Sequence, residues 1–192
     1  MSTRGNDRRA RATVLRRHGV RALTAGAALA AAMIAVAGPA HAATGVSVTG
    51  SALEITGDRV SDGIVVFVDA DGSLRVRNTG DTVVPGASCV AVTANEVDCA
   101  SAGVIAVVAG TGAGNDSFRN RTSLPSKVAL GLGADSFIGG LGRDSASGDE
   151  GDDKLGGLAG NDVLVGGAGV DTTDGGDGTD RCDAETEFFC ES

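Results

Sequence analysis

Six aspartates recur at every ninth residue in the C-terminal part of the chain, and each follows a glycine by two positions. Carboxylates and the exposed backbone carbonyls of glycine turns are oxygen donors, which hard divalent cations such as calcium prefer. A chain rich in glycine and aspartate would not by composition alone repeat this Gly-x-Asp unit six times at a constant nine-residue spacing. The pattern therefore predicts an array of metal-binding turns. The candidate ligands are Asp135, Asp144, Asp153, Asp162, Asp171 and Asp180, with Gly133, Gly142, Gly151, Gly160, Gly169 and Gly178.

Each nine-residue unit divides into a turn of six residues and a strand of three. A turn with carbonyls and one carboxylate supplies about half of a calcium coordination shell, so a second turn must supply the rest. If two units make one coil, turns that lie two units apart stack on one edge. The aspartates then form two columns, with an ion expected between neighbours at four positions. One column holds Asp135, Asp153 and Asp171, and the other holds Asp144, Asp162 and Asp180.

The unit resembles the RTX (hemolysin-type) calcium-binding nonapeptide GGxGxDxUx, in which U is a large apolar residue. The resemblance covers Leu130 to Asp183. It implies bound calcium and an all-β fold, a right-handed parallel β-roll. A further copy from Gly112 to Phe118 adds Asp116 as a candidate ligand, although it precedes Asp135 by two units plus one inserted residue. The first glycine pair is incomplete in three units (Leu130-Gly131, Gly148-Asp149 and Gly157-Leu158), which affects individual carbonyl ligands.

The eighth residue of each unit should point into the coil, because one side of each short strand must be buried. These residues are Phe118, Phe137, Ala146, Leu155, Leu164, Thr173 and Cys182. Ala146 and Thr173 are small or polar for this role, which predicts a thin core. A flexible Gly/Asp tail without a ligand is the alternative interpretation. A tail has no reason to place an apolar residue two positions after each aspartate, so the metal-binding array is favoured.

Residues 1–42 have the organisation of a secretory signal peptide. Several arginines precede an alanine-rich apolar run from Ala22 to Ala37, and Pro39-Ala40-His41-Ala42 follows as a small-residue cleavage sequence. We expect cleavage after Ala42 and a secreted, extracellular protein with no membrane span in its mature form. The apolar run is short for an uncleaved anchor, which is the alternative. The sequence leaves the export route open between the general and the twin-arginine pathways.

The composition after Ala42 excludes some kinds of site. Both histidines, His18 and His41, precede the expected cleavage point, and the chain has no Trp or Tyr. A Ser-His-Asp or Cys-His catalytic site is therefore not expected. Residues 43–192 carry nine Lys or Arg against 24 Asp or Glu, a net charge of −15. Such a charge disfavours nucleic acid and anionic membranes as partners and favours calcium counter-ions.

Four cysteines in an exported chain predict two disulfides, with three possible connectivities. Local pairing of Cys89 with Cys99 and of Cys182 with Cys190 is the simplest. The second pair would fold residues 184–192 over the open end of the coil as a cap. Zinc binding by the four thiols is the alternative, but the chain has no CxxC spacing.

Residues 43–120 are predicted to be rich in β-strands. Short β-branched runs, such as Ile64 to Val68 and Val104 to Val108, are separated by Gly, Asp and Asn. Asp69-Ala70-Asp71-Gly72 is typical of a hairpin turn. The expected division is a signal peptide (1–42), this β-rich region (43–120), the β-roll repeats (121–183) and a disulfide-linked cap (184–192). The sequence leaves open whether the β-rich region forms a small sandwich or extra coils.

The leading functional hypothesis is a secreted calcium-binding β-roll protein that is not an enzyme. It would act as a structural or interaction module at or outside the cell surface, with a protein or surface partner that the sequence leaves unknown. The alternative is a minimal carboxylate-dependent hydrolase or lyase on a β-helix. Its candidate acids and bases are Glu54, Asp58, Asp62, Asp69 and Glu96. An ice-binding roll would need a regular threonine array, which the repeats lack.

Overall fold

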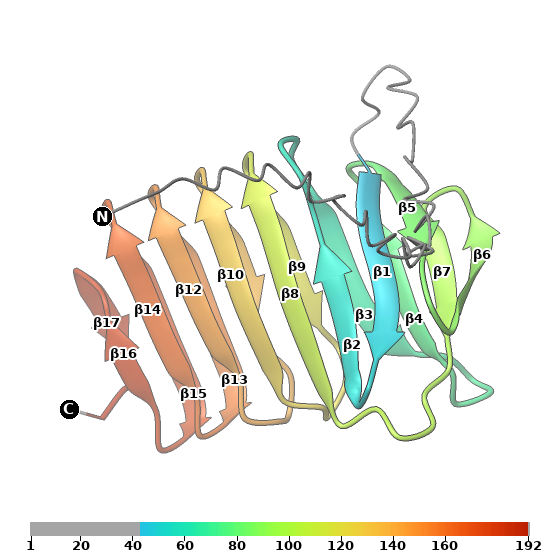
Figure 1. The fold of residues 1–192 in the computed structure, drawn as a ribbon. Coiled ribbons are helices and arrows are strands. Elements are labelled where there is room, and N and C mark those ends of the chain that lie inside the picture. The colour runs from blue at the N-terminus through green and yellow to red at the C-terminus, as the bar shows by residue number, and fades with distance from the viewer. Residues whose placement is uncertain (1–42, 192) are drawn as a thin grey trace, which may run out of the picture. The chain divides into compact units, whose positions relative to one another are not determined.

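The computed structural model describes residues 43–191, which form β-strands and turns without a helix. Accordingly, no helix within this range is able to cross a membrane. The strands belong to two sheets, with the orders β16-β14-β12-β10-β8-β2-β1-β5 and β17-β15-β13-β11-β9-β3-β4-β7-β6 (Figure 1). The predicted signal peptide and its cleavage point after Ala42 lie outside the described residues.

The strands of the first sheet are β1 (Ala43–Thr49), β2 (Ala52–Thr56), β5 (Thr82–Pro85), β8 (Ala106–Ala113), β10 (Ser126–Leu132), β12 (Ser145–Glu150), β14 (Val163–Ala168) and β16 (Arg181–Asp183). Those of the second sheet are β3 (Gly63–Val68), β4 (Leu74–Asn78), β6 (Cys89–Thr93), β7 (Glu96–Cys99), β9 (Ser117–Asn120), β11 (Ser136–Ile138), β13 (Lys154–Gly160), β15 (Thr172–Gly178) and β17 (Thr186–Phe188).

From β8 onward the chain alternates between the sheets, and each coil pairs in parallel with the next. In the first sheet Val128 pairs with Ala146, and Ala146 pairs with Leu164. In the second sheet Phe137 pairs with Leu155 in the same way. The coils stack into a β-solenoid of about five turns, which confirms the all-β, parallel β-roll prediction.

The core of the solenoid lies between the two sheets and is filled mainly by the eighth residue of each unit. Phe118 and Phe137 are fully buried and stack on each other, with ring centroids 6.1 Å apart. Leu155 and Thr173 continue this buried row on the second sheet, and Ala146 and Leu164 are buried on the first sheet. Cys182 is partly buried against the core. The predicted inward position is therefore confirmed, and the core is thinnest where its members are small or polar.

The solenoid begins before the nonapeptide array. β2 pairs in parallel with β8, and β3 pairs in parallel with β9, so residues 52–68 contribute an additional coil. The chain then leaves the coil through β4, β6 and β7, which extend the second sheet by antiparallel pairing. β1 extends the first sheet, antiparallel to β2 and parallel to β5. The region before residue 120 thus contains both a coil and hairpins, on the same two sheets as the repeats.

Both disulfides join neighbours in the sequence, as predicted. Cys89 and Cys99 face each other on the antiparallel strands β6 and β7, and their Cα atoms are 4.0 Å apart. Cys182 on β16 bonds to Cys190, which lies just after β17. The predicted hairpin at 69–72 also forms, because the N–H of Asp69 donates to the carbonyl of Ser73 between β3 and β4.

Candidate metal centre

The aspartates of the first predicted column form a ladder of hydrogen bonds on one edge of the solenoid. The backbone N–H of Asp135 donates to Oδ1 of Asp153 (2.8 Å), and that of Asp153 donates to Oδ1 of Asp171 (2.9 Å). The N–H of Asp116 donates to Oδ1 of Asp135 (2.7 Å), which places Asp116 in the same ladder. Each carboxylate is therefore held by the backbone of the preceding turn, and the four residues stack as the spacing predicts.

A second ladder joins the aspartates of the other column. The N–H of Asp144 donates to Oδ1 of Asp162 (2.7 Å), and that of Asp162 donates to Oδ1 of Asp180 (2.8 Å). This ladder begins one turn later than the first, because Ser126 stands before Asp144 and donates to its Oδ1 through both N–H and Oγ. The seven predicted aspartates are thus divided between two columns.

The second carboxylate oxygen of six predicted aspartates is buried and has no hydrogen-bond partner among residues 43–191. These atoms are Oδ2 of Asp116, Asp135, Asp153, Asp162, Asp171 and Asp180. Leaving one such acceptor unsatisfied costs about 1–3 kcal/mol, and more when it is charged. Oδ2 of Asp144 differs, since it accepts the N–H of Gly140 at 2.7 Å. A row of buried, unpartnered carboxylate oxygens fits a hard cation, which would supply the missing partner.

The glycines of the turns are required by the close stacking of successive coils. Gly151 has a φ of +138°, and a Cβ at this position would collide with the carbonyl oxygen of Gly133 in the preceding turn. A Cβ at Gly148 would collide with Oδ2 of Asp153 and approach the carbonyl of Gly166. Carbonyl and carboxylate oxygens therefore lie close to glycine backbone, where no side chain blocks them.

The irregular units show how the chain tolerates departures from the motif. Asp149 and Leu158 occupy places where a paired glycine would stand, and both adopt positive φ, +73° and +74°. Gly142 is the exception among the six predicted glycines, because its φ is not in the positive range. It packs against Ser123 and Pro125, in a loop over 121–125 that replaces the preceding turn of the second column. The turn containing Gly142 therefore lacks a repeat neighbour on its N-terminal side.

Burial dominates the electrostatics of the columns. It raises the pKa of Asp135 and that of Asp162 to about 6, partly offset by the hydrogen bonds from Asp116 and Asp144. Burial also raises the pKa of Asp153, and the charges of Asp171 and other neighbouring carboxylates act in the same direction. The stacked carboxylates therefore repel each other and are poorly solvated when ionised, and a cation between them would relieve both costs.

Sequence reasoning missed three carboxylates that extend these columns. The N–H of Asp62 donates to Oδ1 of Asp116 (2.8 Å), so Asp62 precedes the first column. The N–H of Asp171 donates to Oε2 of Glu185 (2.8 Å), and that of Asp180 donates to Oε2 of Glu191. A signal for Asp62 exists, since Gly57, Asp62 and Ile64 occupy the first, sixth and eighth places of a degenerate unit. The two glutamates lie in shortened turns, and the nine-residue period does not reveal them.

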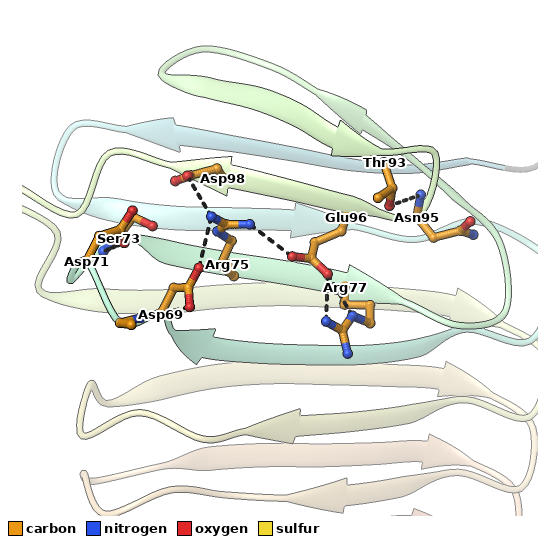
Figure 2. A network of polar contacts seen from close by, with 10 residues as sticks. Asp69, Asp71, Ser73, Arg75, Arg77, Thr93, Asn95, Glu96 and Asp98 are labelled. Carbon is orange, nitrogen blue, oxygen red and sulfur yellow. Dashed lines mark hydrogen bonds and ion pairs between the residues drawn. The ribbon is translucent and has the colours of Figure 1, made fainter.

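The carboxylates proposed for the alternative hydrolase do not form one cluster. Asp69 and Glu96 both bind Arg75, at 2.9 and 3.1 Å, on the hairpin part of the second sheet (Figure 2). Figure 2 also shows Asp98 on Arg75 and Arg77 on Glu96. Asp62 lies in the first aspartate column instead, and Glu54 is exposed on β2. The sequence-based grouping of these residues therefore does not correspond to a common site.

No group of three or more His, Cys, Asp or Glu side chains is placed to hold a metal within residues 43–191. A metal between two turns would therefore take most of its ligands from backbone carbonyls, as the motif predicts.

A family model for the RTX calcium-binding nonapeptide repeat, in four copies, matches residues 131–164 and 147–182. The chain carries RTX repeats. Searches of curated proteins and of solved structures return no significant match.

The RTX match confirms the resemblance for residues 131–182 and supports a calcium-binding β-roll module in this part of the chain. It includes the turns from Asp135 to Asp180 and ends short of both extensions of the columns. The RTX repeats and the coil of β2 and β3 nevertheless share the same two sheets.

Proposed function

We propose that the protein is a secreted, calcium-binding β-roll protein that acts as a non-catalytic structural or interaction module at or outside the cell surface. The observation that carries the proposal is the pair of aspartate columns, whose Oδ1 atoms accept hydrogen bonds from backbone N–H groups. The buried Oδ2 atoms, that of Asp144 excepted, have no hydrogen-bond partner among the residues that the structure describes. This arrangement uses carboxylates at a regular spacing, which suits repeated cation binding better than a single reaction centre.

Calcium would lie between successive turns of one column. Each turn would provide the carboxylate of its aspartate and carbonyl oxygens of its glycines, including those of the predicted set. Bound calcium supplies two positive charges per ion, which offset part of the net charge of −15 on residues 43–192.

Secretion is supported by the N-terminal sequence and by the cysteines. The basic, apolar and small-residue segments that end at Ala42 are typical of a signal peptide. The two disulfides, Cys89–Cys99 and Cys182–Cys190, suit an oxidising compartment. A non-catalytic role is supported by the lack of histidine after His41 and by the engagement of Asp69 and Glu96 with Arg75.

Isothermal titration calorimetry of the mature protein with calcium tests this proposal. We expect several equivalents of calcium, at least the four given by the neighbouring pairs within the two RTX columns. The per-site affinity should be weak to moderate, because each turn contributes one carboxylate. A titration with magnesium is the matched control, since its smaller, near-octahedral shell is poorly served by carbonyl turns. Fewer than two calcium sites would contradict the stacked-turn arrangement.

A further inference from the structure

We propose that residues 57–62 form one more calcium-binding turn, so that the first column holds an ion between Asp62 and Asp116. This inference rests on the proposed calcium binding and extends it to a turn outside the RTX match. Asp62 is 3% exposed, and its N–H donates to Oδ1 of Asp116 at 2.8 Å. Equivalent hydrogen bonds from a backbone N–H to Oδ1 link Asp116 to Asp135 and Asp135 to Asp153. Asp62 therefore occupies the next position of the column.

The carboxylate of Asp62 resembles those of the repeats, because its Oδ2 atom accepts no hydrogen bond from the described residues. Its Oδ2 is buried and has no hydrogen-bond partner in the described part of the chain, and the same holds for Oδ2 of Asp116. A Cβ at Gly57 would collide with Oδ2 of Asp62 and with the carbonyl oxygen of Thr111. In the RTX repeats, a Cβ at Gly148 would meet Oδ2 of Asp153 and a carbonyl of the next coil in the same manner. The oxygen donors are thus arranged alike in the two turns.

The backbone of residues 57–62 also stacks on the following turn as one repeat stacks on the next. A Cβ at Gly112 would collide with the carbonyl oxygen of Asp58. One coil later, a Cβ at Gly131 would collide with the carbonyl oxygen of Gly112 in the same way. Oγ of Ser61 accepts the N–H of Asn115 (2.9 Å). One coil later, Oδ1 of Asn115 accepts the N–H of Ala134 (3.0 Å). The stacking contacts of a repeat thus have counterparts in residues 57–62, although the nine-residue pattern is degenerate here.

The start of the column is closed by two buried side chains. Oδ1 of Asp62 accepts hydrogen bonds from Oγ1 of Thr44 (3.1 Å) and from Nδ2 of Asn78. Asn78 and Thr44 are both fully buried, and Nδ2 of Asn78 also donates to Oγ1 of Thr44 (2.7 Å). They replace the backbone N–H that an earlier coil would provide. Because both hydrogen bonds reach Oδ1, they leave Oδ2 available to a cation.

Calcium binding at this turn would connect the ion array to the hairpin region. Asn78 ends β4, and Thr44 lies in β1, so both added strands contact the carboxylate that would hold the ion. Calcium is expected to slow amide exchange in residues 57–62 as well as in the RTX repeats. This prediction separates a metal-binding turn from a turn that merely caps the column.

Calcium titration of Asp62→Asn, with Asp71→Asn as the control, tests the inference. Asp71 is an exposed aspartate of the β3–β4 turn, so its substitution removes the same charge without affecting the column. We expect Asp62→Asn to lose one calcium equivalent, Asp116→Asn to lose two, and Asp71→Asn to lose none. An unchanged stoichiometry in Asp62→Asn would overturn the inference. If Asp153→Asn still loses calcium in the same experiment, the proposed function would remain intact.

Hydrogen exchange of the unsubstituted protein provides a second measurement, in case Asp62→Asn disrupts the network with Asn78. Calcium should increase the protection of residues 57–62 and 111–116 by a similar factor. Equal exchange of residues 57–62 with and without calcium, alongside protection of the RTX repeats, would identify Asp62 as a structural cap. Calcium-independent exchange throughout the chain would instead contradict the proposed function itself.

Discussion

The backbone N–H of Asp116 donates to Oδ1 of Asp135 at 2.7 Å, although 19 residues separate them instead of the 18 between Asp135 and Asp153. The additional residue is accommodated in the loop over 121–125, at the edge of the second column. It therefore leaves the first column in register, as the pairing of Ser117 with Ser136 shows. Asp135 consequently has an aspartate neighbour on both sides.

This arrangement predicts unequal losses of calcium along the columns. Asp135→Ala, Asp153→Ala and Asp162→Ala should each remove about two equivalents, because each aspartate has a column neighbour on both sides. Asp144→Ala should remove about one, since Ser126 stands before it in the second column. Asp180→Ala should also affect fewer ions than Asp153→Ala, because Asp180 is followed by Glu191 of a shortened turn and not by another repeat aspartate. Calorimetry of the variants measures these differences, and equal losses in all five would contradict the column assignment.

Removing calcium is expected to unfold the RTX repeats while leaving much of residues 43–99 folded. The repeats bury few large side chains and carry many like charges, whereas the hairpin region has a valine-rich core and a disulfide. With a Kd of about 10⁻⁴ M and tenfold higher free calcium, each site contributes about 1.4 kcal/mol. Hydrogen exchange with and without a chelator measures this difference. Equal protection of the repeats in both states would show that their folding does not depend on calcium.

The pH dependence should change sign with calcium. Since burial raises the pKa of Asp135 and of Asp162 to about 6, the calcium-free folded repeats bind more protons than the unfolded chain between about pH 4 and 6. Protonation should therefore favour the folded form of the calcium-free repeats as the pH falls through this window, and this effect should be lost as the pH rises. Calcium needs ionised ligands, so its stabilising effect should disappear as the pH falls below about 6. Circular dichroism of the calcium-free and calcium-bound protein at several pH values measures both effects; a calcium-free form that gains no β structure on acidification would contradict the burial argument.

Replacing Thr173 by valine should stabilise the last coils. Thr173 is fully buried in the row of Phe137 and Leu155, and its Oγ1 has no hydrogen-bond partner within residues 43–191. Valine has nearly the same shape and removes a buried hydroxyl, which is worth about 1 kcal/mol. Urea unfolding in excess calcium measures the gain. Thr179→Val, at an exposed turn position, is the control and should have little effect.

Cleavage after Ala42 would place a new amino terminus beside Asp58. In the structure the backbone nitrogen of Ala43 donates to Oδ2 of Asp58 at 2.5 Å. After cleavage this nitrogen would be an ammonium group, and the hydrogen bond would become a partly exposed ion pair. We expect Asp58→Asn to destabilise the processed protein by about 1 kcal/mol. Mass spectrometry of the exported protein checks the terminus first, and a different first residue would contradict the predicted cleavage.

The sequence by itself determined the periodic part of this protein. A strict nine-residue phase places Asp135, Asp153 and Asp171 on one edge, and it directs Phe137 and Leu155 into the core, because every coil repeats the backbone of the one before it. The two local disulfides and the β3–β4 hairpin were also predictable, since each depends on residues close together in the chain.

The tertiary structure decided how the columns begin and end. Asp62 reaches Asp116 across 54 residues, because β4 to β7 leave the coil and pair at the sheet edge before the chain returns in β8. Glu185 and Glu191 complete the other ends through shortened turns. A local period cannot specify these contacts. They depend on where the inserted strands and the C-terminal segment find unpaired sheet edges and unsatisfied backbone N–H groups, which exist only once the coils have stacked.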